Sequence, residues 1–414
     1  MNVTIDTNRL QAELGQLAAF SSSQGPGVTR VLWSEADQQA RAFMRRLCDQ
    51  AGLRVREDAL GNLFARWVGS APDLPAVASG SHIDAIPDSG RYDGTVGVLG
   101  ALEAIRALQQ AGFQPQRSLE LILFTAEEPT RFGIGCLGSR VLAGTLDPAA
   151  LRQLRDRAGA TLDELRAAAG FVGDLGQVAL APGCYSAFLE LHIEQGPLLE
   201  QAGLPIGIVR AIAAPASLRI ALHGQGGHAG AVLMPARHDA LLAAAEIALA
   251  VEAAALATGS PDTVATTGVL RIEPGAINSI PARALLEIDV RDIASAPRDQ
   301  ALAAIERAAD EICARRGIHA ERTLLNADPP AMGDPALIEL VAQACQEHGI
   351  GHQVMVSRAY HDSLFMARVC PTSMIFIPCR GGVSHRPDEY AAPEAIARGV
   401  EVLARSLAAA SVMP

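Results

Sequence analysis

The sequence predicts an α/β protein in which a smaller α+β domain interrupts a larger one. Three observations support this fold class. The chain of 414 residues is too long for one ordinary hydrophobic core. Up to His192, short apolar segments alternate with helical patterns, which is typical of a sheet covered on both faces. Beyond residue 213, polar and apolar residues alternate in segments ordered β-α-β-β-α-β, which indicates a small split-βαβ domain.

In the first domain, Ser34 and Asp37 resemble a capping box that opens a helix ending near Gly52. Residues 53–69 predict a hairpin that turns at Gly61-Asn62. The elements that follow are a buried strand at 75–81, a helix at 94–111 stopped by Gly112, a strand at 118–124, short helices at 138–144 and within 147–170, and a strand at 186–192.

The inserted domain is expected at residues 214–327. Its predicted strands lie at 217–224 and within 266–292, and its predicted helices at 238–257 and 299–317. The chain then returns to the first domain with a helix at 336–349, a strand at 372–379 and a final helix. The catalytic domain would therefore comprise residues 1–213 and 328–414.

Composition excludes several classes of partner. A net charge of −11 argues against nucleic acid or an anionic membrane surface as the main partner. No apolar run reaches the ~18 residues that a membrane helix needs, and charged residues interrupt the N-terminal segment where a secretory signal would be apolar. Seven scattered cysteines without a CxxC motif fit a reducing compartment. We therefore expect a cytoplasmic protein.

Potential metal ligands follow several predicted strands. Each histidine alone is more typical of a structural or surface position. Because these strands end at one edge of a single sheet, however, their donors are expected to meet there. Imidazole and carboxylate without thiolate suit a hydrolytic Zn, Mn or Co centre. The donors are His82, Asp84 and Asp93 after the first buried strand, Glu127 and Glu128 after the second, His192 with Glu194 after the third, and His385 after the last.

The adjacent pair Glu127 and Glu128 allows two interpretations. Pro129 stops the preceding strand, so both carboxylates belong to the loop past its carboxyl end. A solvated surface loop is the simpler interpretation of an isolated pair of acids. Two like charges this close resist full ionisation unless positive charge stands beside them, and a metal centre would supply it.

The motifs GSHID, YDG, FTAEEPTRFG, ELHIEQGP, GGHAGAVLMP, GAINSIPA and SHRPDE occur in this order. Together they resemble the dinuclear-metal amidohydrolases related to peptidase family M20, in the hydantoinase and carbamoylase branch. The resemblance covers nearly the whole chain. It implies a metallopeptidase-like catalytic domain with a central mixed sheet flanked by helices, an inserted dimerisation or lid domain, and a homodimer joined through that domain. It also implies two divalent ions per subunit, with Mn²⁺ favoured and Zn²⁺, Co²⁺ or Ni²⁺ as alternatives.

By this resemblance, the metal ligands would be His82 and His192 for one ion and Glu128 and His385 for the other, with Asp93 as the bridge. Glu127 would stay uncoordinated and act as general base. Asp84 would accept the free ring N–H of His82.

The resemblance also implies substrate contacts. Arg291 would grip a substrate carboxylate as a bidentate fork, with Asn278 assisting it. Without the resemblance, Arg291 reads as an exposed strand residue paired with Asp289 or Asp292. His228 would reach the partner's active site and polarise the scissile carbonyl, and Gln195 would touch the ureido group.

The stretch SRAYHDSLFMAR resembles the branch of the family that acts on ureidoglycolate. Tyr360 stands beside His361 where related enzymes carry glycine, so its ring is expected to narrow the pocket. The activity implied is hydrolysis of a ureido C–N bond in a small carboxylate-bearing ureide, here (S)-ureidoglycolate to glyoxylate, ammonia and CO₂ in purine catabolism. The alternatives are an N-carbamoyl-L-amino acid hydrolase, an allantoate amidohydrolase, or an inactive metal-binding homologue.

Overall fold

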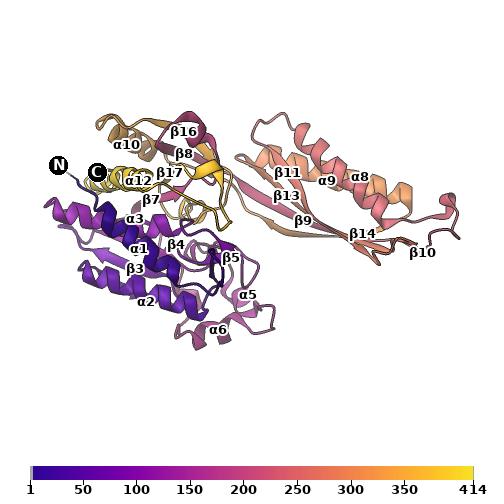
Figure 1. The fold of residues 1–414 in the computed structure, drawn as a ribbon, viewed down its shortest axis with the longest axis horizontal. Coiled ribbons are helices and arrows are strands. Elements are labelled where there is room, and N and C mark those ends of the chain that lie inside the picture. Colours follow the sequence, from indigo (N-terminus) through magenta and orange to yellow (C-terminus); the bar gives the residue numbers. More distant parts are fainter. Residues whose placement is uncertain (1–2, 414) are drawn as a thin grey trace. The chain divides into compact units, whose positions relative to one another are not determined.

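The computed structural model describes residues 3–413, which divide into two compact units (Figure 1). The larger unit runs to Arg210 and resumes at Met332, and the smaller unit is Ala211–Ala331. The sequence places the domain boundaries close to these positions. The dimerisation and lid role expected of the smaller unit stays a prediction.

The larger unit is built on a mixed nine-stranded sheet in the order β15-β8-β17-β7-β4-β6-β3-β2, with β16 paired to β8. Its strands are β2 (Arg54–Glu57), β3 (Leu63–Trp67), β4 (Ala76–His82), β6 (Leu119–Phe124), β7 (Tyr185–Ile193), β8 (Ile206–Ile212), β15 (Ala331–Met332), β16 (His352–Ser357) and β17 (Thr372–Ile377), and β1 (Val28–Arg30) pairs separately with β5 (Ala85–Ser89). Four neighbours, β17, β7, β4 and β6, run parallel. Their carboxyl ends therefore meet at one edge, as the strand pattern predicts.

Helices cover both faces of this sheet. They are α1 (Thr7–Ala19), α2 (Glu35–Gln50), α3 (Thr95–Gln110), α4 (Leu137–Leu142), α5 (Pro148–Gln153), α6 (Leu162–Ala168), α7 (Leu198–Ala202), α10 (Pro335–Gln346), α11 (Ser363–Met366) and α12 (Pro393–Ala410), with short 3₁₀ turns at η1 (Leu175–Gln177) and η3 (Arg380–Gly382). As predicted, Ser34 caps α2 by accepting the N–H of Asp37. The helix α1 is not predicted from the sequence.

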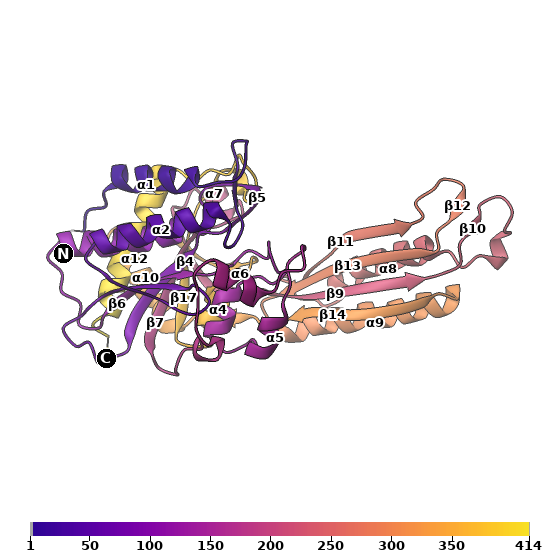
Figure 2. The same cartoon turned by 90° about the horizontal axis from the view of Figure 1, so that it is seen from below.

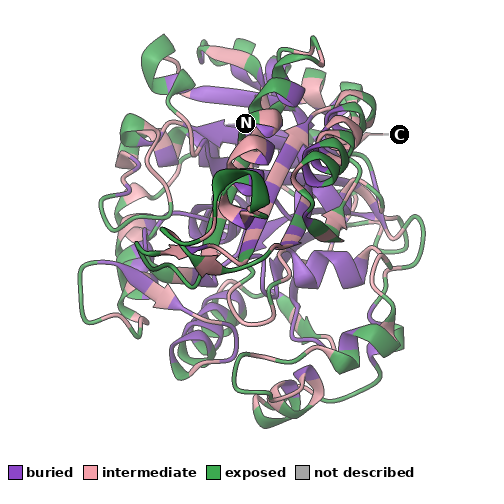
Figure 3. Ribbon diagram, turned by 90° about the vertical axis from the view of Figure 1, so that its right-hand side faces the viewer, coloured by how far each residue is buried: buried purple, intermediate pink, exposed green. Residues whose placement is uncertain are grey.

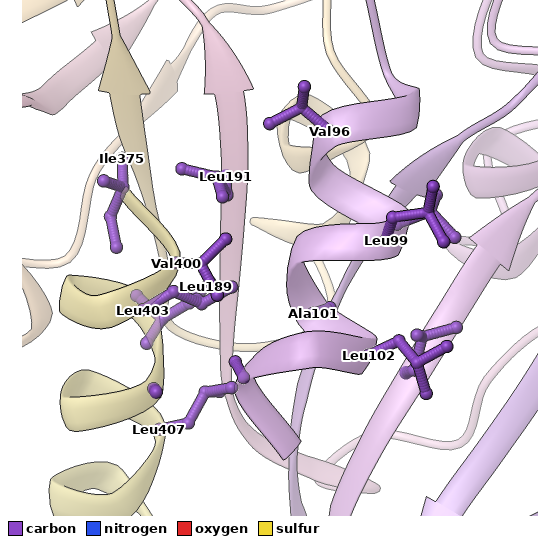
Figure 4. Packing of buried hydrophobic residues seen from close by; sticks show 14 of the residues in the cluster. Val96, Leu99, Ala101, Leu102, Leu189, Leu191, Ile375, Val400, Leu403 and Leu407 are labelled. Carbon is purple, nitrogen blue, oxygen red and sulfur yellow. The ribbon is translucent and has the colours of Figure 1, made fainter. Parts of the chain in front are cut away.

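Side chains that alternate along the strands build two cores, one on each face of the sheet. Leu189 and Leu191 of β7 point to the side covered by α3 and α12 (Figure 4), whereas Phe188 points to the side covered by α4 to α6. A Cβ added at Gly100 of α3 would lie 2.8 Å from Leu191. This close approach lets α3 lie directly on β7, and the loop before α3 is thereby held beside the carboxyl end of β7.

The smaller unit has the predicted β-α-β-β-α-β order. Its sheet is antiparallel in the order β11-β13-β9-β14, and both long helices pack on one face of it through a shared core (Figure 2). The elements are β9 (Ala214–His223), α8 (Ala240–Leu256), β11 (Val264–Glu273), β13 (Arg283–Asp292), α9 (Ser295–Arg316) and β14 (His319–Ala327), with a ribbon of β10 (Gly227–His228) and β12 (Ser279–Ile280) and the turn η2 (Met234–Ala236).

Figure 3 shows buried strands in the interior, while many of the surrounding helices carry exposed as well as buried residues. Within residues 3–413, no helix combines the length and apolar character needed to cross a membrane.

Leu191 offers a test of this core. It is fully buried between β7, α3 and α12. Leu191→Ala should lower the free energy of unfolding by about 2–5 kcal/mol, because it leaves a cavity that rigid neighbours cannot close. The matched control is Leu198→Ala, since Leu198 is 51% exposed. Urea unfolding measures both variants. An equal, small effect of the two substitutions would show that this packing contributes little.

Candidate metal centre

The donors predicted from the sequence meet at the carboxyl edge of the parallel strands. His82 is the last residue of β4, and His192 is the last but one of β7. Glu127 and Glu128 follow β6. Asp93 precedes α3, and His385 follows β17. Segments far apart in the chain thus bring their side chains to a single site.

Asp93 lies at the centre of these donors. Its Oδ1 is 3.2 Å from Nε2 of His192 and 3.6 Å from Nε2 of His82. Its Oδ2 is 3.4 Å from Nε2 of His385, which is in turn 3.2 Å from Oε1 of Glu128. Two groups of donors, His82–Asp93–His192 and Asp93–Glu128–His385, each have the spacing of a cation site and share only Asp93.

The two buried histidines present the correct ring nitrogen. Nδ1 of His192 lies 2.9 Å from the carbonyl oxygen of Ile193, and Nδ1 of His82 lies 3.1 Å from that of Asp84. Because a carbonyl can only accept, each Nδ1 carries a proton, and the lone pair of each neutral ring is on Nε2. That arrangement is the one a metal-binding histidine requires.

Asp84 accepts the ring N–H of His82, as expected, but through its main-chain carbonyl. Its carboxylate lies 3.7 Å from the His82 ring, and its main-chain carbonyl accepts the ring N–H instead. The carboxylate accepts the main-chain N–H groups of Glu127 and Glu128 at 3.2 and 3.0 Å. It therefore fixes the backbone of the two glutamates rather than the imidazole.

The electrostatics of the site call for positive charge. Hydrogen bonding to Asp93 and Glu128 raises the pKa of His385 to about 11. The pKa of Glu127 lies well above its usual range, chiefly because the carboxyl group is buried. The nearby His82 lowers this pKa, and the negative charge of Glu128 raises it. Burial also raises the pKa of Asp362 to about 8, with Glu190 adding to the effect. Clustered buried carboxylates of this kind are stabilised by divalent cations, so the donor set fits a metal centre.

A second layer of side chains holds the Asp93 loop. Glu389 accepts the N–H groups of Tyr92 and Asp93 at 2.8 and 3.1 Å. Ser384 and Gln195 each donate to Oδ2 of Asp93, at 2.6 and 2.7 Å. Sequence reasoning missed Glu389 and Ser384, although both belong to the GVSHRPDE segment that pointed to His385.

Gln195 keeps one polar atom without a partner. Its Oε1 is buried and accepts no hydrogen bond within the described part of the chain. A buried carbonyl oxygen without a donor is costly, so it marks a position where a ligand N–H would be favourable.

His361 and Tyr360 lie next to the centre. The ring of His361 meets that of His192 edge-on, with centroids 4.5 Å apart, and its Nε2 is 2.9 Å from the Ser357 hydroxyl. Tyr360 is half-buried; its ring stacks on Phe365 and its hydroxyl is 3.5 Å from Nη2 of Arg140. The structure thus shows what supports the Tyr360 ring, while its effect on substrate choice stays a prediction.

In the smaller unit, the predicted residues separate into two places. His228 and Asn278 line one groove of about 620 Å³ at the β10–β12 ribbon. Arg291 lies at the far end of β13, where its Nε donates to Asp289 at 2.7 Å. Asn278 therefore lies beside His228, at the other end of β13 from Arg291, and the expectation that it assists Arg291 stays a prediction. The pairing with Asp289 is the alternative that the sequence also allowed.

The family model and the similar proteins all point to one family of hydrolases. Residues 78–409 match the model of peptidase family M20/M25/M40. Ureidoglycolate hydrolase of Arabidopsis thaliana is 54% identical over 99% of this chain and 88% of its own length. An N-carbamoyl-L-amino acid amidohydrolase of Geobacillus stearothermophilus is 38% identical over 96% of this chain and 97% of its own. The resemblance inferred from the motifs is confirmed.

Solved structures agree. The structure of AtUAH in complex with glyoxylate superposes with a TM-score of 0.90 at 53% identity, covering 99% of both chains. A hydantoinase/carbamoylase-family amidase from Burkholderia multivorans superposes with a TM-score of 0.89 at 34% identity, covering 100% of this chain and 99% of its own. These matches confirm the predicted fold class, a central mixed sheet with a separate antiparallel sheet.

Gly94 tests whether the geometry of the histidines controls metal binding. It adopts φ +64°, and an added Cβ would lie 2.4 Å from Nε2 of His82. Gly94→Ala should therefore reduce bound divalent metal, measured by elemental analysis after dialysis. Gly112→Ala is the matched control, because Gly112 has φ +70° with nothing within 4 Å of its added Cβ. Equal metal content in the two variants would argue against a site at His82.

Proposed function

The chain belongs to peptidase family M20/M25/M40, and we propose that it hydrolyses the ureido C–N bond of (S)-ureidoglycolate, giving glyoxylate, ammonia and CO₂. The similarity to ureidoglycolate hydrolases at 53–54% identity supports this choice within the family. The site supports it independently, because a buried cluster of imidazoles and carboxylates stands beside an unsatisfied amide acceptor.

Two divalent ions are proposed as cofactors, with Mn²⁺ favoured. His82 and His192 would hold one, Glu128 and His385 the other, and Asp93 would be shared by both, as the two donor groups support. When bound, the ions would polarise the ureido carbonyl and lower the pKa of the attacking water. Carboxylate-rich binding suits Mn²⁺.

Glu127 is proposed as the general base. It is buried beside the donors, yet it belongs to neither donor group; its Oε2 is 3.8 Å from Nε2 of His82. It would take a proton from the attacking water and pass it to the leaving nitrogen. The carbamate released would decompose to ammonia and CO₂, and the hydroxyglycine would lose the second ammonia.

Gln195 is proposed to bind the ureido nitrogen. Its Nε2 is engaged by Asp93, while its buried Oε1 lacks a donor. The terminal NH₂ of a ureido group would supply one. Arg291 is proposed to bind the substrate carboxylate, because its planar fork matches that group. In this arrangement Asp289 would hold the guanidinium in place.

The inserted sheet supports a role for two subunits. Arg283 borders the groove of His228 and Asn278, and Arg291 lies eight residues further along the same strand. At ~3.4 Å per residue this is roughly 27 Å. A molecule as small as ureidoglycolate cannot touch both places in one chain. If both groups act on one substrate, as proposed, they come from different chains, with His228 of the partner subunit polarising the carbonyl.

A second copy of the chain is the proposed partner. Leu242, Leu249 and Leu256 of α8 are 40%, 69% and 79% exposed and repeat every seven residues, so they form one apolar stripe along the helix. In a two-fold dimer, the stripe of one subunit can pack against the same stripe of the other. We propose a homodimer joined through this unit.

The substrate is tested by comparing ureidoglycolate, allantoate and N-carbamoyl-L-amino acids on the Mn²⁺-loaded protein. We expect kcat/KM for ureidoglycolate to exceed the others by at least about tenfold, because a pocket narrowed by Tyr360 excludes larger groups. Chelation should abolish turnover and Mn²⁺ restore it. Preference for a carbamoyl amino acid or allantoate would replace the substrate proposed, and no turnover of any of them by fully loaded protein would favour an inactive homologue.

Glu127→Gln and Glu128→Ala separate the roles of the pair. Glu127→Gln should keep two metal equivalents and lose ~10²–10⁴-fold in kcat, because a general base is removed without a ligand. Glu128→Ala should lose one metal equivalent as well. Elemental analysis and steady-state kinetics measure both. Equal metal loss in the two variants would show that the roles of base and metal ligand are not divided between Glu127 and Glu128 as proposed.

Complementation tests the shared site. Glu127→Gln and His228→Ala chains, each inactive alone, should regain about a quarter of wild-type activity when co-refolded in equal amounts, since half of the dimers are mixed and each mixed dimer has one intact site. Co-refolding Glu127→Gln with Glu128→Ala chains is the control and should stay inactive. A fully active monomer at assay concentration would contradict the proposal.

A further inference from the structure

We propose that Cys136 is a positioning residue for the base: its S–H group binds Oε1 of Glu127 and directs Oε2 to the reacting atoms. The proposal rests on the function proposed above, because it assumes that Glu127 is the base. Sγ of Cys136 lies 3.3 Å from Oε1 of Glu127, within hydrogen-bonding range for sulfur. The other oxygen, Oε2, faces Nε2 of His82.

The thiol supplies a donor that the carboxylate needs. Both groups are buried, and two anions in contact there would repel each other strongly, so a proton lies between them. Burial raises the pKa of the Cys136 thiol well above its usual range, and the neighbouring Glu127 adds to the shift. The sulfur therefore keeps its proton and acts as the donor.

The backbone holds the sulfur in this position. The N–H of Cys136 donates to the carbonyl of Glu127 at 2.7 Å, and the N–H of Leu137 donates to that of Ala126 at 2.8 Å. Cys136 adopts φ +53°, a left-handed conformation uncommon for residues other than glycine. Such outliers gather at functional sites, where the surrounding structure enforces them.

The contact restricts a torsion that is otherwise soft. The terminal torsion of a glutamate side chain has a broad energy minimum, so an unanchored carboxylate rotates. Glu127 cannot be anchored by a metal if it is to remain a base. With the thiol on Oε1, rotation is limited and Oε2 stays directed toward the donors of the centre.

The test compares Cys136→Ala, which removes the donor, with Cys136→Ser, which keeps one. Cys136→Ala should lower kcat by about tenfold with KM and metal content unchanged, because misplacing a catalytic group slows the chemical step. Cys136→Ser should recover most of the loss, since a hydroxyl also donates. Cys370→Ala, another buried cysteine, is the control and should behave as wild type.

A spectroscopic measurement is independent of turnover. The S–H stretching band of Cys136 is isolated as the infrared difference between wild type and Cys136→Ala. Introducing Glu127→Gln should shift this band to higher frequency, because an amide oxygen accepts more weakly than a carboxylate. A band insensitive to Glu127→Gln, wild-type kcat in Cys136→Ala, or equal losses in the alanine and serine variants would overturn the inference. A shifted band in a protein that hydrolyses no ureide would instead refute the proposed function and leave the contact established.

Discussion

The site depends on the two hydrogen bonds that the Asp84 carboxylate accepts from the backbone of Glu127 and Glu128. Asp84 follows β4 and the glutamates follow β6, so this contact ties the ends of two neighbouring parallel strands together. Because both oxygens are used, the two peptide groups have a fixed orientation. The side chain of Glu128 then joins the donors around Asp93, whereas the side chain of Glu127 lies beside them and contacts Cys136.

Around this contact, the carboxylates are distributed so that each has a different neighbour. Asp93 faces three histidines, Glu128 faces His385, and Glu127 faces the thiol of Cys136. Similar groups within a few ångströms of each other thus have different chemistry. Their surroundings, rather than their residue type, determine which one can bind a cation and which one can take a proton.

Sequence reasoning identified the places where strands end better than it identified the partners of individual atoms. His82, Asp93 and His192 could be placed at one edge because strands that alternate with helices run parallel, so their carboxyl ends lie at the same edge of the sheet. The carbonyl that accepts the His82 N–H could not, because main-chain and side-chain oxygens of one residue compete and only local angles decide. Asn278 and Arg291 lie at opposite ends of β13, so whether they act together depends on the arrangement of subunits, which the pattern of one chain does not show. The contact of Cys136 with Glu127 depends on how the loop between them closes, and the pattern of polar and apolar residues does not predict the conformation of a loop.

The loop from Glu127 to Cys136 is clamped at its base by consecutive main-chain hydrogen bonds from residues 136, 137 and 138 to residues 127, 126 and 125. Its tip, at Pro129 and Gly133, is exposed. These three bonds hold the base of the loop in one conformation, and Phe132 and Ile134 within the loop pack against the core. Substitutions at the exposed tip are therefore expected to disturb the site less than substitutions at residues 125–127 and 136–138, which close the loop.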